Sequence, residues 1–124
     1  LVPKPEIEIR DKSGKTGLIY FGATTPAVHE ALDGLDREGI KVNALRLKAF
    51  PFTRDVIAFC AAHERVLVVE QNRDAQMRSL LMTEADVPGS KLIATLNYDG
   101  MPLTAAFVRG AILKELRPAQ VAAE

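Results

Sequence analysis

The stretch Val66-Leu-Val-Val-Glu-Gln-Asn72 decides the fold class of this chain. Four consecutive apolar residues are typical of a strand buried on both faces, in the middle of an α/β sheet. The chain then leaves the sheet through Glu70, Gln71 and Asn72, and the carboxyl ends of parallel strands are where ligands and partners bind. A structural interpretation competes, in which Asn72 or Asp74 caps the next helix and Glu70 is a satisfied polar group. From the residues alone we favour the structural interpretation.

Three other apolar segments begin at Leu18, Val42 and Leu92. With the segment at Val66 they start 24, 24 and 26 residues apart, which fits strands joined by crossover helices. Apolar residues recur at helical spacing between them, as the crossovers require. The sequence therefore predicts a three-layer α/β/α domain with a mostly parallel sheet.

The segment Gly22-Ala-Thr-Thr25-Pro26 follows the first of these strands and predicts the start of a helix. Thr25 can cap that helix, and proline suits its first position. A helix start with two hydroxyls can also hold an anion, which makes Gly22, Thr24 and Thr25 an alternative anion site. We favour capping. Thr53 and Thr104 are expected to open two later helices in the same way.

The composition is that of a globular domain and excludes several classes of function. The 124 residues are 48% hydrophobic, and 16 basic residues balance 16 acidic ones. No basic patch suggests nucleic-acid binding, and no apolar run approaches the ~18 residues of a membrane span. We therefore expect a cytoplasmic protein. Leu1 is not an initiator residue, so we interpret the chain as part of a longer protein.

Cysteine and histidine offer no metal site or nucleophile. One cysteine, Cys60, excludes an internal disulfide and a four-cysteine iron–sulfur cluster within the chain. It lies on the inward face of a predicted helix and is expected in the core. His29 and His63 have no metal-ligand spacing, and we assign neither a catalytic role. The glycine-rich phosphate motifs of this fold class and the nucleophile elbow are also absent.

One pair of carboxylates remains open as a general acid/base pair. Glu70 and Asp99 both follow strands and would approach each other if those strands were neighbours. Tyr98, beside Asp99, could offer a hydroxyl or a stacking face, although packing over the end of the sheet is commoner. We name no catalytic residue.

Several short motifs, in this order, resemble one family. They are Gly22-Ala-Thr, Glu38-Gly39-Ile-Lys-Val42, Leu45-Arg46, Phe50-Pro51-Phe52, Val69-Glu-Gln-Asn72 followed by Gln76, and Tyr98-Asp-Gly100-Met-Pro102. Together they resemble the C-terminal region of the α subunit of 2-oxoacid:ferredoxin oxidoreductases, which is itself similar to the C-terminal domain of transketolase. The likeness covers about Thr16 to Leu116. Ala75 and Asn97 depart from the glycine and the lysine that the family often has there, which weakens a role in binding coenzyme A.

This resemblance implies a sheet of five strands with one antiparallel edge strand, either near Ile7 or from a late segment. It divides the chain into an arm or edge strand (1–15), the domain (16–117) and a tail (118–124). It also implies a parent enzyme that uses thiamine diphosphate, Mg²⁺, an iron–sulfur cluster and coenzyme A, with 2-oxoglutarate as the first candidate for its 2-oxoacid. The implied partners are other domains of the α subunit, the β subunit and ferredoxin.

In such an enzyme this domain would be a non-catalytic interface domain that binds no cofactor or metal alone. The expected contacts to partners or along the substrate route are Glu70, Gln71, Asn72, Gln76, Tyr98, Asp99 and Gly100. Two alternatives stay open: the C-terminal domain of a transketolase-like or dehydrogenase E1-like enzyme, and a free-standing module that binds a small ligand or a protein.

Overall fold

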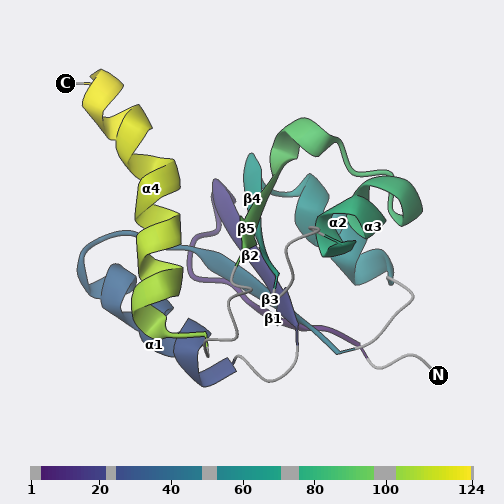
Figure 1. Ribbon diagram of the computed structural model, residues 1–124, viewed down its shortest axis with the longest axis horizontal. Coiled ribbons are helices and arrows are strands. Elements are labelled where there is room, and N and C mark those ends of the chain that lie inside the picture. Colours follow the sequence, from purple (N-terminus) through teal and green to yellow (C-terminus); the bar gives the residue numbers. More distant parts are fainter. Residues whose placement is uncertain (1–3, 22–24, 49–52, 71–75, 97–102, 124) are drawn as a thin grey trace.

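The computed structural model describes residues 4–21, 25–48, 53–70, 76–96 and 103–123 (Figure 1). The strands are β1 (Glu6–Glu8), β2 (Thr16–Phe21), β3 (Asn43–Leu47), β4 (Arg65–Glu70) and β5 (Leu92–Leu96). The helices are α1 (Thr25–Arg37), α2 (Arg54–Ala61), α3 (Gln76–Glu84) and α4 (Ala105–Ala123), and a 3-10 turn, η2 (Gly89–Lys91), precedes β5.

The sheet has the strand order β1-β3-β2-β4-β5. β2 pairs parallel with β3 and β4, β4 pairs parallel with β5, and β1 pairs antiparallel with β3. The predicted five-stranded, mostly parallel sheet with one antiparallel edge is therefore confirmed. Of the two candidates for that edge, the segment near Ile7 is the correct one.

Helices cover both faces of the sheet, with α1 and α4 on one face and α2 and α3 on the other (Figure 1). Side chains alternate across each strand, so Leu67 and Val69 of β4 face α1 and α4, whereas Val66 and Val68 face α2 and α3. All four are at most 4% exposed. This confirms that the stretch at Val66 is buried on both faces.

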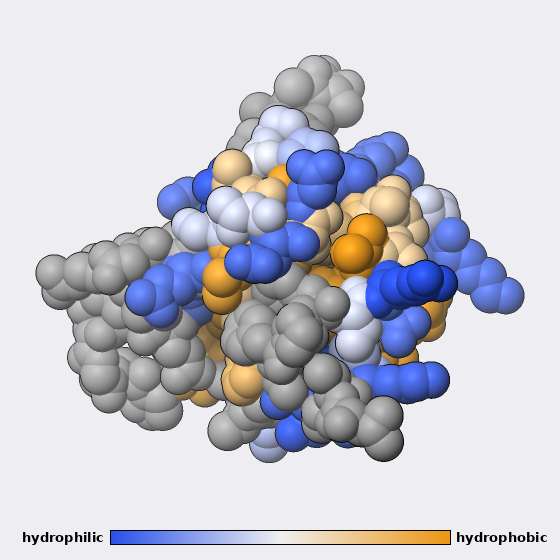
Figure 2. All heavy atoms as spheres, turned by 90° about the vertical axis from the view of Figure 1, so that its right-hand side faces the viewer, coloured by the Kyte–Doolittle hydropathy of each residue, from blue (hydrophilic) through white to orange (hydrophobic). Residues whose placement is uncertain are grey.

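The outer surface of the α2 and α3 layer is mixed in character. On the face shown in Figure 2, apolar atoms appear in separate places between charged side chains. Ile57 of α2 and Met82 of α3 are the large apolar side chains exposed on these two helices. No helix in the described ranges combines the length and the apolar content needed to cross a membrane.

The helix starts differ in how they are capped. Thr104 caps α4 as expected, because its Oγ1 accepts a hydrogen bond from the backbone N–H of Phe107 at 3.1 Å. Thr53 precedes α2 as expected, but its hydroxyl is buried and makes no hydrogen bond to the described residues. α1 begins at Thr25, whose side chain lies outside the described part. The α4 backbone is helical to Ala123 and so includes residues expected as a tail, while the domain boundary at residue 117 stays a prediction.

At the amino end of β3, the side chain of Asn43 holds the β1–β2 connection. It is 2% exposed, and its Oδ1 accepts hydrogen bonds from the backbone N–H groups of Arg10 and Asp11 at 2.7 and 2.8 Å. Its Nδ2 donates to the carbonyl of Asp11 at 2.7 Å and lies 2.9 Å from Nε2 of His63. All four hydrogen-bonding positions of this amide are therefore used.

The Asn43 amide also fixes the state of His63, which is 3% exposed. Since Oδ1 of Asn43 faces two N–H donors, its orientation is determined, and Nδ2 must donate to Nε2 of His63. The Nδ1 of His63 lies 2.6 Å from the carbonyl oxygen of Phe59, which can only accept, so Nδ1 carries the proton. His63 is thus a fully bonded core residue, and this explains why it needs no catalytic role.

We expect the substitution Asn43→Ala to lower the free energy of unfolding by about 2–4 kcal/mol, because it leaves buried donors near Arg10 and Asp11 without an acceptor. Urea unfolding followed by circular dichroism measures the change. Lys12→Ala, at an exposed position in the same connection, is the control, with an expected change within about 0.5 kcal/mol. Equal effects of the two substitutions would contradict the assigned role of the amide.

Candidate functional site

The carboxyl ends of the four parallel strands β2, β3, β4 and β5 lie at one edge of the sheet. β4 and β5 are neighbours, with Glu70 opposite Leu96, so these two strands end side by side at this edge. Of the candidate residues, the structure describes Glu70 and Gln76 in full and the backbone of Thr25. The others lie outside the described residues: Gly22, Thr24, Gln71, Asn72, Tyr98, Asp99 and Gly100.

Glu70 is the last residue of β4, and its carboxylate caps the start of α3. The side chain is buried, with a relative exposure of 3%. Its Oε1 accepts a hydrogen bond from the backbone N–H of Met77 at 2.6 Å, and its Oε2 accepts one from the N–H of Arg78 at 3.3 Å. These N–H groups belong to the first turn of α3, where no helical carbonyl can accept from them. Glu70 is therefore a satisfied polar group, as the structural interpretation predicted, and it caps α3. Asn72 and Asp74, the two predicted caps, lie outside the described residues.

Two opposing effects act on the acidity of Glu70. Burial is the larger and raises the pKa of its carboxyl group, while the hydrogen bonds from Met77 and Arg78 partly lower it. The negative charge also lies at the positive end of the α3 dipole. Because both carboxylate oxygens are already bonded to backbone donors, the geometry favours a structural role over proton transfer to a substrate.

α3 is anchored at a second point by the side chain of Arg78. The guanidinium of Arg78 donates from Nε to the carbonyl of Leu92 at 3.0 Å and from Nη2 to the carbonyl of Gly89 at 2.9 Å. The first turn of α3 is thus tied both to the carboxyl end of β4 and to the segment that opens β5. Gln76, the first residue of α3, is exposed at this edge.

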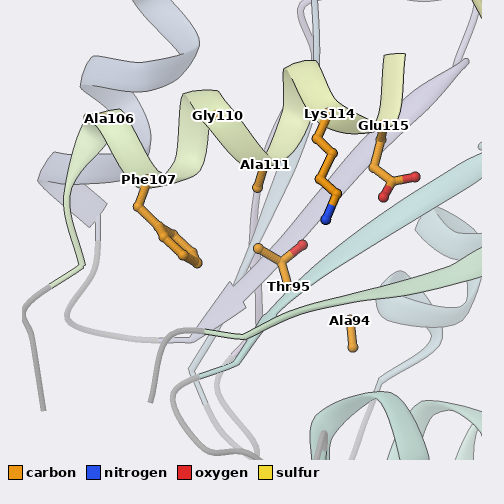
Figure 3. Close-up of a pocket in the computed structure, with 8 residues that line it drawn as sticks. All are labelled: Ala94, Thr95, Ala106, Phe107, Gly110, Ala111, Lys114 and Glu115. Atoms are coloured by element: carbon orange, nitrogen blue, oxygen red, sulfur yellow. The ribbon is translucent and has the colours of Figure 1, made fainter. Parts of the chain in front are cut away.

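A separate groove lies between β5 and α4 and has a volume of about 420 Å³ (Figure 3). Thr95 of β5 points toward α4, and Phe107 and Lys114 of α4 point back toward β5. The remaining lining residues are Ala94, Ala106, Gly110, Ala111 and Glu115. Small side chains on the α4 side leave this space open. Sequence reasoning missed the groove, although the spacing of Ala106 and Gly110 by one helical turn was visible.

The described residues provide no metal site and no reactive thiol. No group of three or more histidine, cysteine or acidic side chains among them could hold a metal ion. Cys60 is 1% exposed, as expected for a core residue, and burial raises the pKa of its thiol to about 11. His29, on the outer side of α1, has half of its side chain exposed.

Comparison with known proteins identifies a relative that is a subunit of an oxidoreductase. No protein-family model matches the chain. The chain is 31% identical over 108 residues to subunit alpha of 2-oxoacid:ferredoxin oxidoreductase 2 from Aeropyrum pernix. That match covers 86% of this chain and 16% of the relative, so the chain corresponds to a small part of the larger subunit.

Solved structures agree with this relationship. A 2-oxoglutarate:ferredoxin oxidoreductase from Magnetococcus marinus superposes with a TM-score of 0.82 at 28% identity, over 92% of this chain and 20% of that one. Two further structures, below 25% identity, share the fold. One is a split-gene transketolase with a TM-score of 0.64 at 19% identity, over 90% of this chain and 41% of that one. The other is the alpha chain of a probable 2-oxoacid ferredoxin oxidoreductase from Thermoplasma acidophilum. It has a TM-score of 0.60 at 23% identity, over 92% of this chain and 97% of that one.

We expect Glu70→Ala to lower the free energy of unfolding by about 1–2 kcal/mol at neutral pH, because two N–H groups of α3 lose their acceptor. Glu70→Gln, which keeps one carbonyl oxygen in the same place, should cost clearly less. Urea unfolding of both variants measures the difference. If Glu70→Ala were as stable as the wild type, the capping role would be wrong.

A comparison of the wild type with Glu70→Gln also tests the raised pKa of the Glu70 carboxyl group. When the pKa of a carboxyl group is higher in the folded than in the unfolded state, its stabilisation is complete below the unfolded pKa and is lost as the pH rises through the folded pKa. We therefore expect the wild type to lose stability relative to Glu70→Gln as the pH rises from about 4, the ordinary pKa of a glutamate, towards neutrality. A difference that grows in favour of the wild type over this range would contradict the dominant effect of burial.

Three lines of observation now agree. The order of short motifs along the chain, the five-stranded sheet with its antiparallel edge strand, and the sequence and structural relatives all point to one family. The chain belongs to the α subunits of 2-oxoacid:ferredoxin oxidoreductases, in which it forms a transketolase C-terminal-like domain.

Proposed function

We propose that this chain is a non-catalytic interface domain in an enzyme that oxidatively decarboxylates a 2-oxoacid to an acyl-coenzyme A and reduces ferredoxin. The similarity to the Magnetococcus marinus enzyme carries this proposal, because it extends over 92% of the chain. That enzyme is a 2-oxoglutarate:ferredoxin oxidoreductase with 2-oxoglutarate, coenzyme A and succinyl-CoA bound. We take 2-oxoglutarate as the first substrate to test and the cytoplasm as the location.

In this proposal the cofactors are held elsewhere in the enzyme. Thiamine diphosphate with Mg²⁺ and an iron–sulfur cluster would be bound by other domains of the α subunit or by the β subunit. Two features of the chain support this division: its single cysteine is buried, and its sequence has no phosphate-binding glycine motif. Ferredoxin and the β subunit are the proposed partners of the whole enzyme.

The carboxyl edge of the sheet is the proposed contact with neighbouring domains or with the route of substrate and coenzyme A. Glu70 would act there indirectly, by holding α3 against β4. Gln76 is the described residue free to make a direct contact, because its side chain is exposed at the start of α3. The segments with Gln71, Asn72, Tyr98, Asp99 and Gly100 complete the proposed surface.

The test is activity of the complete enzyme. We expect the α subunit that contains this chain, purified with its β subunit, to reduce a viologen dye when supplied with coenzyme A and 2-oxoglutarate. Pyruvate and branched-chain 2-oxoacids are assayed in parallel and identify the substrate if it is another one. A complex that carries thiamine diphosphate and intact clusters but reduces the dye with none of them would overturn the proposed reaction.

Within that assay, Gln76→Ala tests the role of the carboxyl edge. We expect a rise of several-fold in KM for coenzyme A or the 2-oxoacid, or partial loss of the β subunit on gel filtration. Glu84→Ala, an exposed position at the far end of the same helix, is the control and should change neither. Identical behaviour of the two variants would remove the carboxyl edge from the proposal.

A further inference from the structure

The two edges of the sheet are built differently. β1, at one edge, has three residues, two of which are glutamates. Glu6 forms ion pairs with Arg46 at 3.2 Å and Lys48 at 3.0 Å. Short length and charge are the usual means by which an exposed edge strand avoids pairing with another chain. The β1 edge is therefore suited to remain in solvent.

β5, at the other edge, has none of these protections. Its residues Leu92–Leu96 read Leu-Ile-Ala-Thr-Leu, with no charge and no proline. In the described part of the chain, β5 pairs with β4 on one side and with no strand on the other. An uncharged open edge of this kind is a template for a further strand, and natural proteins normally cover it. The contrast with β1 indicates that the β5 edge is covered in the assembled protein.

The groove beside β5 is lined by one polar side chain of that strand. This is Thr95, which is 9% exposed. Figure 3 shows its hydroxyl directed toward α4, in the direction of Lys114. A hydroxyl that faces a groove can donate or accept a hydrogen bond, so Thr95 offers a polar contact to a segment that enters it.

The α4 side of the groove leaves room for that segment. A side chain added at Gly110 would meet no atom within 4 Å, and the neighbouring lining residues Ala106 and Ala111 are small. Lys114 and Glu115 lie together at one end of the groove, form no ion pair with the described residues and carry opposite charges. The lining thus favours a segment with uncharged side chains over a strongly charged one.

We propose that an extended, uncharged segment from the remainder of the α subunit binds along β5 as an additional strand, with its alternate side chains in the groove between β5 and α4. Strand addition of this kind takes affinity from backbone hydrogen bonds and specificity from pockets for alternate side chains. The larger subunit is the proposed source of the segment because the relatives from Aeropyrum pernix and Magnetococcus marinus extend far beyond this domain, which spans 16% and 20% of their lengths. This inference rests on the proposed function of the chain as an interface domain of that larger subunit.

Hydrogen exchange resolved to single amides in the complete α subunit tests the proposal. The N–H groups of β5 point alternately toward β4 and toward the open edge. We expect both sets to exchange slowly, within about tenfold of each other. Rapid exchange of the outward set, at the rate of solvent-exposed amides, would overturn the proposal. The measurement needs no substrate or cofactor turnover, so it is independent of whether the proposed reaction is found.

A matched pair of variants locates the covering segment in the groove. Gly110→Leu fills the groove, whereas Gly34→Leu adds the same side chain to α1, where the nearest atom lies 3.9 Å away on Arg37. Both replace a helical glycine by a better helix former, so both are expected to fold. We expect the outward β5 amides to exchange roughly 100-fold faster in Gly110→Leu than in the wild type. In Gly34→Leu their exchange rate should equal that of the wild type. No change in Gly110→Leu, or protection of the wild type that disappears on dilution as for a second copy, would overturn the proposal.

Discussion

The burial of β4 on both faces is the constraint on which the rest of the structure depends. Because Val66 to Val69 are at most 4% exposed, helices must cover both sides of the strand, and this requires crossover connections. The strand ends in a carboxylate that is equally buried. That carboxylate is stable there because the first turn of α3 offers two unpaired N–H groups to Glu70. One strand thus determines the layers and the position of the helix that follows it.

The layers and the order of elements could be predicted from sequence because they depend on local patterns. Apolar runs, helical spacing and the intervals between strands are each visible within a few turns of chain. The capping by Glu70 was not predictable, since the acceptor belongs to a strand and its donors are seven and eight residues away on a helix. The Asn43–His63 contact and the groove between β5 and α4 were missed for the same reason: each joins residues distant in sequence.

The contacts of Glu70 decide between the two interpretations of the candidate site. A Glu-Gln-Asn sequence at a strand end suggests acid/base chemistry or a partner contact, and sequence alone leaves both open. The structure uses the glutamate to fix α3, and Arg78 fixes the same helix to the segment before β5. The first turn of α3 is thus fixed at two points. This agrees with a domain that contributes packing and interfaces to a larger α subunit rather than reacting groups.

The most direct test of this account is the steady-state kinetics of Glu70→Gln in the complete enzyme, at neutral pH and with its melting temperature measured in parallel. The substitution keeps a hydrogen-bond acceptor for α3 but removes the titratable proton. We predict a kcat within about twofold of the wild type, because no proton transfer passes through this side chain. A kcat lower by about 100-fold or more in a protein of unchanged melting temperature would show that Glu70 is an acid/base group and would contradict the account.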